Sequence, residues 1–109
     1  MTKEEEKIQR MKNELLGLGP MLPGSISEQW NVCGTPGCQC KDPKRPVRHG
    51  PYFQLSFSVK GRSSTLFVRR NEVPEARRRI RRYQRFKELA MALTQAYVDL
   101  VRSLGLTRS

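Results

Sequence analysis

Residues 33 to 49 read Cys-Gly-Thr-Pro-Gly-Cys-Gln-Cys-Lys-Asp-Pro-Lys-Arg-Pro-Val-Arg-His. This stretch contains all three cysteines and the single histidine of the 109-residue chain. Three thiols and one imidazole are a complete donor set for a tetrahedral zinc ion, and no other segment supplies a further ligand of these types or a disulfide partner. The first hypothesis is therefore a structural zinc site with one ion per chain, bound by Cys33, Cys38, Cys40 and His49.

The spacing of these four residues allows a metal site but differs from the most familiar zinc fingers. Gaps of four, one and eight residues separate Cys33, Cys38, Cys40 and His49 in turn. The Gly and Pro residues between the first two cysteines suit a tight turn that aims two sulfurs at one point. A redox thiol pair would have two residues between its cysteines, and that spacing is absent here. Three cysteines without a function would have no reason to cluster beside the only histidine. Zinc is therefore favoured over both rivals.

A catalytic role for this metal is not expected. Four protein ligands close the coordination sphere, whereas a hydrolytic zinc keeps one position for water. If water replaced His49 as the fourth ligand, the only nearby general base would be Glu28, which is a weak candidate. The sequence thus predicts a protein that is not an enzyme.

The chain is strongly basic. It has 21 Lys and Arg against 10 Asp and Glu, a net charge of +11, and a pI near 10.3. Such an excess favours polyanionic partners, foremost nucleic acid, with DNA favoured over RNA. An anionic membrane surface ranks second, but there is neither an apolar run of 18 residues nor a lipidation motif. No secretory signal is visible at the acidic N-terminus, so a reducing, cytoplasmic location is expected, which keeps thiols available for metal.

The length suits one small domain with a thin core. A chain of this size buries only about 65% of its unfolded surface, so a bound metal or a partner would offset the small apolar core. The expected segments are a helix and connector at 1–23, a zinc loop at 24–50, a β-hairpin at 51–70, a long helix at 71–105 and a tail at 106–109.

The N-terminal segment has the pattern of a capped amphipathic helix. Thr2 and Glu5 have capping-box spacing. Apolar residues then recur at three and four positions, which predicts a helix from about Lys3 to Leu16. After it, Trp30 is expected in the small core of the metal loop. Stacking of Trp30 on a nucleic-acid base is the alternative.

The motifs around the cysteines also resemble a known family. Gly24-Ser25-Ile26-Ser27, the segment from Cys33 to Cys40, and His49-Gly50-Pro51-Tyr52 are similar to the signature of short prokaryotic proteins of unknown function that are often found near transposase-like mobile elements. The likeness runs from about residue 24 to residue 104. It implies the same Cys, Cys, Cys, His constellation and no established activity.

Residues 51–70 alternate between apolar and polar side chains, which predicts two antiparallel strands. A turn at Lys60-Gly61 pairs Leu55 with Leu66 and Phe53 with Val68, which places the apolar residues on one face. The other face carries Gln54 and several hydroxyl residues, with Lys60 and Arg62 at the tip. Such a ribbon can enter a DNA major groove, but a solvated outer face fits this composition equally well.

A long helix is predicted from about Pro74 to Leu104. Its apolar residues form a coiled-coil-like seam made by Ala76, Tyr83, Phe86, Ala90, Leu93, Tyr97, Leu100 and Leu104. The distal half of this seam can pack antiparallel on the N-terminal helix. A second copy of the chain, or another protein, could use the same seam.

The first half of this helix is crowded with arginine. No acid lies between Ala76 and Lys87, and like charges one turn apart repel, so a polyanion is the simplest source of compensation. If about six of these side chains contact phosphates, the logarithm of affinity should fall against the logarithm of salt with a slope near −5. The candidate nucleic-acid-binding residues are Arg77, Arg78, Arg81, Arg82 and Arg85 on the helix, Lys60, Arg62 and Arg69 on the hairpin, and Lys44, Arg45 and Arg48 in the loop.

Together these patterns predict an α+β protein: a short N-terminal helix, a zinc loop, a two-stranded antiparallel hairpin and a long basic C-terminal helix. The expected function is non-catalytic, zinc-stabilised nucleic-acid binding, as an accessory or regulatory factor of a mobile element. The alternative is a protein–protein adaptor that pairs through the helical seam.

Overall fold

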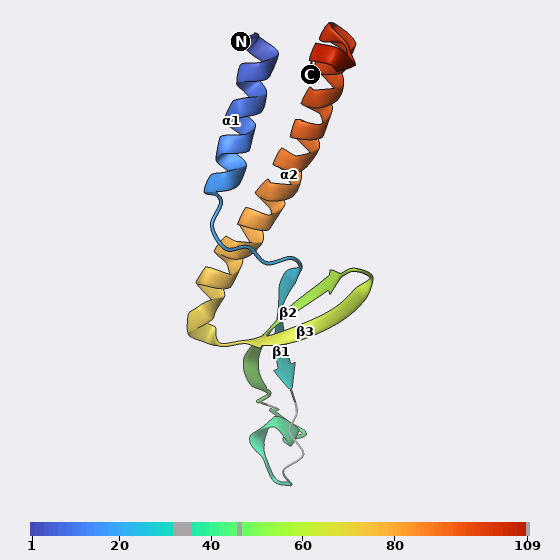
Figure 1. Ribbon diagram of the computed structural model, residues 1–109. Coiled ribbons are helices and arrows are strands. Elements are labelled where there is room, and N and C mark those ends of the chain that lie inside the picture. Colours follow the sequence, from blue (N-terminus) through green and yellow to red (C-terminus); the bar gives the residue numbers. More distant parts are fainter. Residues whose placement is uncertain (32–35, 46, 109) are drawn as a thin grey trace. The chain divides into compact units, whose positions relative to one another are not determined.

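The computed structural model describes residues 1–31, 36–45 and 47–108 (Figure 1). The main elements are α1 (Lys3–Gly17), β1 (Ser25–Asn31), β2 (His49–Val59), β3 (Arg62–Val68) and α2 (Val73–Leu104). Short 3₁₀ turns lie at Gln39–Lys41, Arg70–Glu72 and Leu106–Arg108. The chain forms two compact units, one made of residues 1–22 with 81–109 and the other of residues 23–80. The α+β class is confirmed, whereas the expected two-stranded hairpin is part of a sheet with three strands.

α1 begins at the predicted capping box. The Thr2 hydroxyl accepts a hydrogen bond from the Glu5 amide at 3.2 Å, and the Glu5 carboxylate accepts one from the Thr2 amide at 3.1 Å. Two amides of the first turn are thereby satisfied, which fixes where the helix starts. The helix ends at Gly17, one residue beyond the predicted end.

α1 packs antiparallel on the distal half of α2 in the first unit (Figure 1). Ile8, Ala96 and Leu100 are buried between the helices, and Met11, Leu93 and Leu104 flank them. Leu93, Leu100 and Leu104 of the predicted seam lie in this contact. The prediction missed Leu89 and Ala96, which are buried, and Tyr97 remains 37% exposed. The Lys12 ammonium lies 5.5 Å from the centre of the Tyr97 ring, which therefore borders the contact and faces a cation. No described helix could cross a membrane.

The β2–β3 hairpin has the predicted register. Leu55 pairs with Leu66, Phe53 with Val68 and Val59 with Arg62. Lys60 and Gly61 have φ values of 54° and 75°, which is the geometry of a type I′ turn whose twist suits a two-residue hairpin. The apolar and polar alternation and the Lys60-Gly61 turn were thus sufficient to predict the register of this hairpin.

The third strand, β1, corrects the expectation that residues 24–50 form only a metal loop. β1 pairs antiparallel with β2, with Ile26 opposite Leu55 and Asn31 opposite His49. Its sequence lacks the apolar alternation of a typical strand, and it is held by backbone pairing at the sheet edge instead. Trp30 is half exposed on this strand, so it does not form a core for the loop.

The register divides the sheet into two faces. The apolar face carries buried Leu55 and Val68 with half-buried Phe53 and Phe57. In the same unit, Val73 and Ala76 of α2 are also buried. We call the opposite side the polar face; it is made by Ser25, Ser27, Gln29, Tyr52, Gln54, Ser56, Ser58, Ser63, Thr65 and Phe67.

Gly24 is required where the chain enters β1, and Gly24→Ala is expected to lower the free energy of unfolding. Its φ is +95°, and a Cβ atom there would lie 2.1 Å from the Ser56 carbonyl oxygen. A strained backbone and a clash with main chain together should cost about 2 to 4 kcal/mol. Urea unfolding of the variant measures this loss.

Gly17→Ala is the matched control for that experiment. Gly17 is the last residue of α1, and no atom lies within 4 Å of its hypothetical Cβ. This variant should leave stability unchanged or raise it slightly. Equal unfolding midpoints for the two variants would contradict the packing described for Gly24.

Candidate metal centre and basic surface

The loop between Pro36 and His49 is folded back on itself by backbone hydrogen bonds. Gly37 adopts a φ of +77° in a turn that leads into Cys38. The Lys41 amide donates to the Cys38 carbonyl at 3.0 Å, and the Val47 amide donates to the Gln39 carbonyl at 2.9 Å. The second of these bonds closes the loop and returns the chain to His49, the first residue of β2.

Closing the loop brings three predicted ligands together. One donor atom from each of Cys38, Cys40 and His49 lies within 4.8 Å of the others. The Cys38 sulfur is 3.0 Å from His49 Nε2. Cys40 is only 2% exposed, and the other two side chains are half-buried. These residues are therefore close enough to hold a metal ion.

The donor set fits a thiophilic ion. Two thiolates and an imidazole around a tetrahedral zinc ion would have donor atoms about 3.5 to 3.8 Å apart, given bond lengths of about 2.0 to 2.3 Å. The one contact within the set, from the Cys38 sulfur to His49 Nε2, is shorter than this at 3.0 Å, and all three donor atoms lie within 4.8 Å of one another, so shifts of about 1 Å would reach this spacing. Cys33 lies outside the described residues, and its role as a fourth ligand stays a prediction. The nearest described residue before it, Asn31, is the strand partner of His49.

Trp30 borders this cluster through Gly50. A Cβ atom on Gly50, whose φ is +145°, would lie 3.1 Å from the Trp30 indole and 2.7 Å from the Gln29 carbonyl oxygen. The indole therefore rests on the backbone next to His49. Because of this contact, the fluorescence of Trp30, the only tryptophan of the chain, should report on changes in the structure of the loop.

The predicted basic residues of the second unit are exposed. They are Lys44, Arg45 and Arg48 in the loop, and Lys60, Arg62 and Arg69 on the hairpin and just beyond it. Arg62 pairs with Val59 and so shares the side of the apolar face, rather than the polar face. Arg69 follows β3 in extended conformation. We call these six exposed residues the basic surface; they come from three segments, which are the loop, the hairpin tip and the end of β3.

Three predicted arginines of α2 have partners within the chain. Arg78 donates to the Glu75 carboxylate at 2.9 Å, which also accepts from Arg79. Arg82 Nη1 donates to the Pro20 carbonyl at 3.1 Å. The third, Arg85, pairs with Glu14 and Glu88.

Arg85 clamps α1 to α2. Its Nε and Nη2 donate to the two carboxylate oxygens of Glu14 at 2.5 and 2.8 Å, and Nη1 donates to Glu88 at 3.2 Å. The hydrogen bonds from Arg85 lower the pKa of the Glu14 carboxyl, and those to Glu14 and Glu88 raise the pKa of Arg85. Both side chains are exposed, so the paired hydrogen bonds from Arg85 to Glu14 orient the two helices but add little to the stability of the fold.

Arg77 and Arg81 differ from these three arginines. Within the described part of the chain, neither has an ion pair or hydrogen bond, and both are exposed. They lie four residues apart on one side of α2 and repel each other. The ion pairs of Glu75 with Arg78 and Arg79 could have been predicted from their spacing of three and four residues on a helix. Glu14 is 71 residues from Arg85, and no pattern in the sequence predicts that they pair.

A family model described as Domain of unknown function (DUF6788) matches residues 1–78. No curated protein matches the chain, and no solved structure does. The match includes α1, the sheet and the Cys/His cluster, and it ends within α2.

Proposed function

The chain belongs to the DUF6788 family of domains of unknown function, and from its own residues we propose that it is a non-catalytic, zinc-stabilised nucleic-acid-binding protein. The similarity of its motif to proteins encoded near mobile elements extends the proposal to an accessory or regulatory factor of such an element. Zinc holds the loop in this proposal, and the basic surface binds the phosphates.

The observation that carries the proposal is the uncompensated pair Arg77 and Arg81. Arginine is suited to bidentate contact with phosphate, and two exposed guanidinium groups one turn apart raise the free energy of the helix when nothing lies between them. A nucleic-acid backbone bound to both guanidinium groups would offset this repulsion, because its phosphates attract each of them. The two residues are four positions apart, about 6 Å along the helix axis, so one polyanion can reach both.

Charge in the second unit supports the same proposal. Residues 23–80 contain eleven Lys and Arg against four Asp and Glu, an excess of seven, whereas the first unit has ten against six, an excess of four. The unit that holds the Cys/His cluster therefore carries most of the net charge. Nucleic acid is the commonest polyanion that such a surface meets in a cell.

Zinc fits the proposal as a structural ion. Residues 23–80 have few fully buried side chains, of which Leu55 and Cys40 are the largest. A metal bound by Cys38, Cys40 and His49, with Cys33 as the proposed fourth ligand, would add the stability that so small a core lacks. It would also hold Lys44, Arg45 and Arg48 on a fixed loop.

The adaptor alternative would need the seam on α2 to be available. Leu93, Leu100 and Leu104 already contact Ile8 and Met11 of α1 in the same chain. A partner on this face would have to displace α1, whose Ile8 is buried against α2 and whose Glu14 pairs with Arg85. Nucleic-acid binding requires no such rearrangement and is preferred for that reason.

Fluorescence anisotropy with three labelled probes tests the proposal. Duplex DNA, single-stranded DNA and RNA of equal length should each be retained by the full chain at about 50 mM salt and released at about 200 mM salt. The absence of binding to all three probes at the lower salt concentration would overturn it.

A further inference from the structure

Two aromatic rings lie side by side on the polar face of the sheet. Phe67 on β3 is 66% exposed and Tyr52 on β2 is 36% exposed. Their ring centres are 6.5 Å apart and the rings are tilted by 49°. Polar faces of antiparallel sheets normally turn hydrophilic residues to water, so an exposed aromatic pair on this one points to a ligand.

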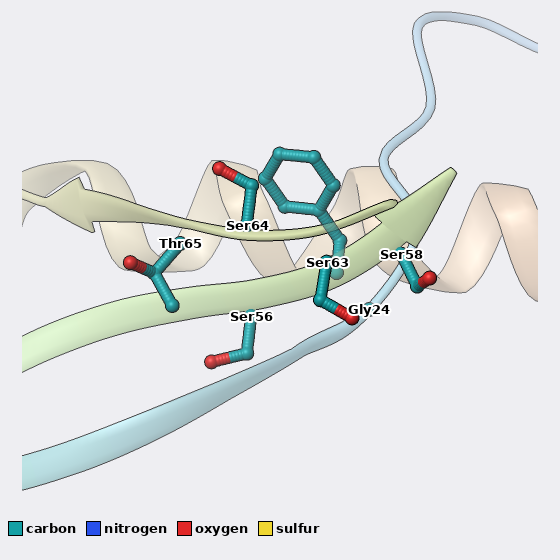
Figure 2. A pocket seen from close by; sticks show the side chains of 7 residues that line it. Gly24, Ser56, Ser58, Ser63, Ser64 and Thr65 are labelled. Atoms are coloured by element: carbon teal, nitrogen blue, oxygen red, sulfur yellow. The ribbon is translucent and has the colours of Figure 1, made fainter. Parts of the chain in front are cut away.

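Most of the groups around the pair can form hydrogen bonds and carry no charge. Gln54 lies between Ser27 and Phe67 in the sheet register, and Ser56 lies between Ser25 and Thr65. Next to this row, an open hollow of about 670 Å³ is lined mainly by hydroxyl residues of both faces, among them Ser56 and Thr65 of the polar face and Ser64 of the other (Figure 2). Amide and hydroxyl groups beside aromatic rings are suited to base edges and sugars, whose donors and acceptors are also uncharged.

The charges favour a polyanion over a protein on this face. Within the described sheet, no residue of the polar face is acidic, and the unit that contains it carries an excess of seven positive charges. Arg69 follows Phe67 by two residues in extended backbone, so alternation places it in the same row. An apolar pair with a basic residue beside it binds bases and phosphate at the same time.

We propose that the polar face binds single-stranded nucleic acid, with bases stacked on Phe67 and Tyr52. This inference rests on the proposed function and adds the class of its substrate. Bases in a duplex are stacked on each other and expose only their edges, whereas an unpaired base offers the flat surface that these rings require. Arg69 and the other cations of residues 23–80 attract either form of nucleic acid, and the aromatic pair selects the single strand.

Phe67→Ala is the decisive variant. With a labelled single strand of about twelve nucleotides, its affinity should fall about tenfold or more, whereas duplex affinity stays within about twofold. Phe67→Trp should retain the affinity for the single strand, because the stacking surface is kept. Far-UV circular dichroism and thermal melting check that each variant is folded.

Leu66→Ala is the matched control. Leu66 is adjacent in β3 and 51% exposed, but it pairs with Leu55 on the other side of the sheet. Its substitution should leave binding of the single strand unchanged. Equal losses for both variants would show a general effect on β3 and overturn the stacking site.

A second measurement uses the wild-type chain, so it does not depend on how a variant folds. A single strand that carries 5-iodouracil should crosslink on irradiation to Phe67 or Tyr52, as mapped by mass spectrometry of the digested complex. Crosslinks only to residues outside the polar face would overturn the inference.

The outcomes separate this inference from the proposed function. If the wild type binds no probe, the proposed function itself fails. If it binds and Phe67→Ala matches it on the single strand, only the stacking site fails. If Phe67→Ala instead converts a dimer into a monomer, measured by sedimentation, with unchanged affinity for the single strand, the face is an interface between two copies and the inference is wrong.

Discussion

Replacing Arg77 and Arg81 together with glutamate is expected to weaken nucleic-acid binding about 100-fold at about 50 mM salt. Each lost phosphate contact accounts for about 1 kcal/mol near a polyanion, and repulsion from each new carboxylate adds roughly half as much, which together gives the about 2.8 kcal/mol of a 100-fold change. The fold should be unaffected, since neither side chain has a partner among the described residues. Anisotropy titration with one labelled strand measures the change in affinity.

Lys3→Glu with Lys7→Glu is the matched control for this experiment. These residues are also exposed, also lie four apart on a helix, and produce the same change in net charge. Because they lie on α1, away from the arginine pair in the sequence and on a helix rich in acid, affinity should fall less than about threefold. A similar loss in both double variants would mean that net charge alone drives binding and that α2 has no special part in it.

Removal of the metal has the second large expected effect. A strong zinc chelator should release about one zinc ion per chain and unfold the loop around Cys38, Cys40 and His49. A structural zinc contributes several kcal/mol to folding, so the melting temperature of the second unit should fall by more than about 10 °C. The emission of Trp30 should change with it, because its indole rests on Gly50 beside His49.

Two variants control the chelation experiment. Cys40→Ala should reproduce the chelated state and show no further change when the chelator is added. Arg48→Ala, one residue before His49 and exposed, should bind zinc and melt like the wild type. A metal-free protein that melts at the same temperature as the untreated one would contradict the structural role of zinc.

The elements that follow local rules could be predicted from the sequence. The capping box of Thr2 and Glu5 set the start of α1, and the Lys60-Gly61 turn set the register of the hairpin. In both cases the deciding contacts lie within a few residues, where spacing alone determines which groups meet. The clustering of Cys38, Cys40 and His49 was predicted in the same way from closely spaced ligands.

The features that depend on long-range contacts could not be predicted. β1 contains mostly polar residues, so its strand character comes from pairing with β2 and has no hydrophobic period of its own. Glu14 and Pro20 accept hydrogen bonds from arginines that lie more than sixty residues away in the sequence. The seam on α2 was predicted in part: it included Leu100 but also the exposed Tyr97, and it missed Ala96. Several faces of this helix carry apolar residues, and the position of α1 selects among them.

These contacts also revise the number of phosphates that the protein can bind. Arg78, Arg82 and Arg85 are engaged within the chain, which leaves Arg77, Arg81 and the scattered cations of residues 23–80 for a ligand. About four contacts, rather than six, are expected on a single strand, which gives a slope near −3 for the logarithm of affinity against the logarithm of salt.

The most direct test of nucleic-acid binding is therefore this slope, measured for the wild-type chain with one labelled single strand between about 50 and 200 mM salt. Retention of the strand at the lowest salt with a slope near −3 is the predicted result. No retention there, or an affinity that does not change with salt, would contradict binding through the basic surface.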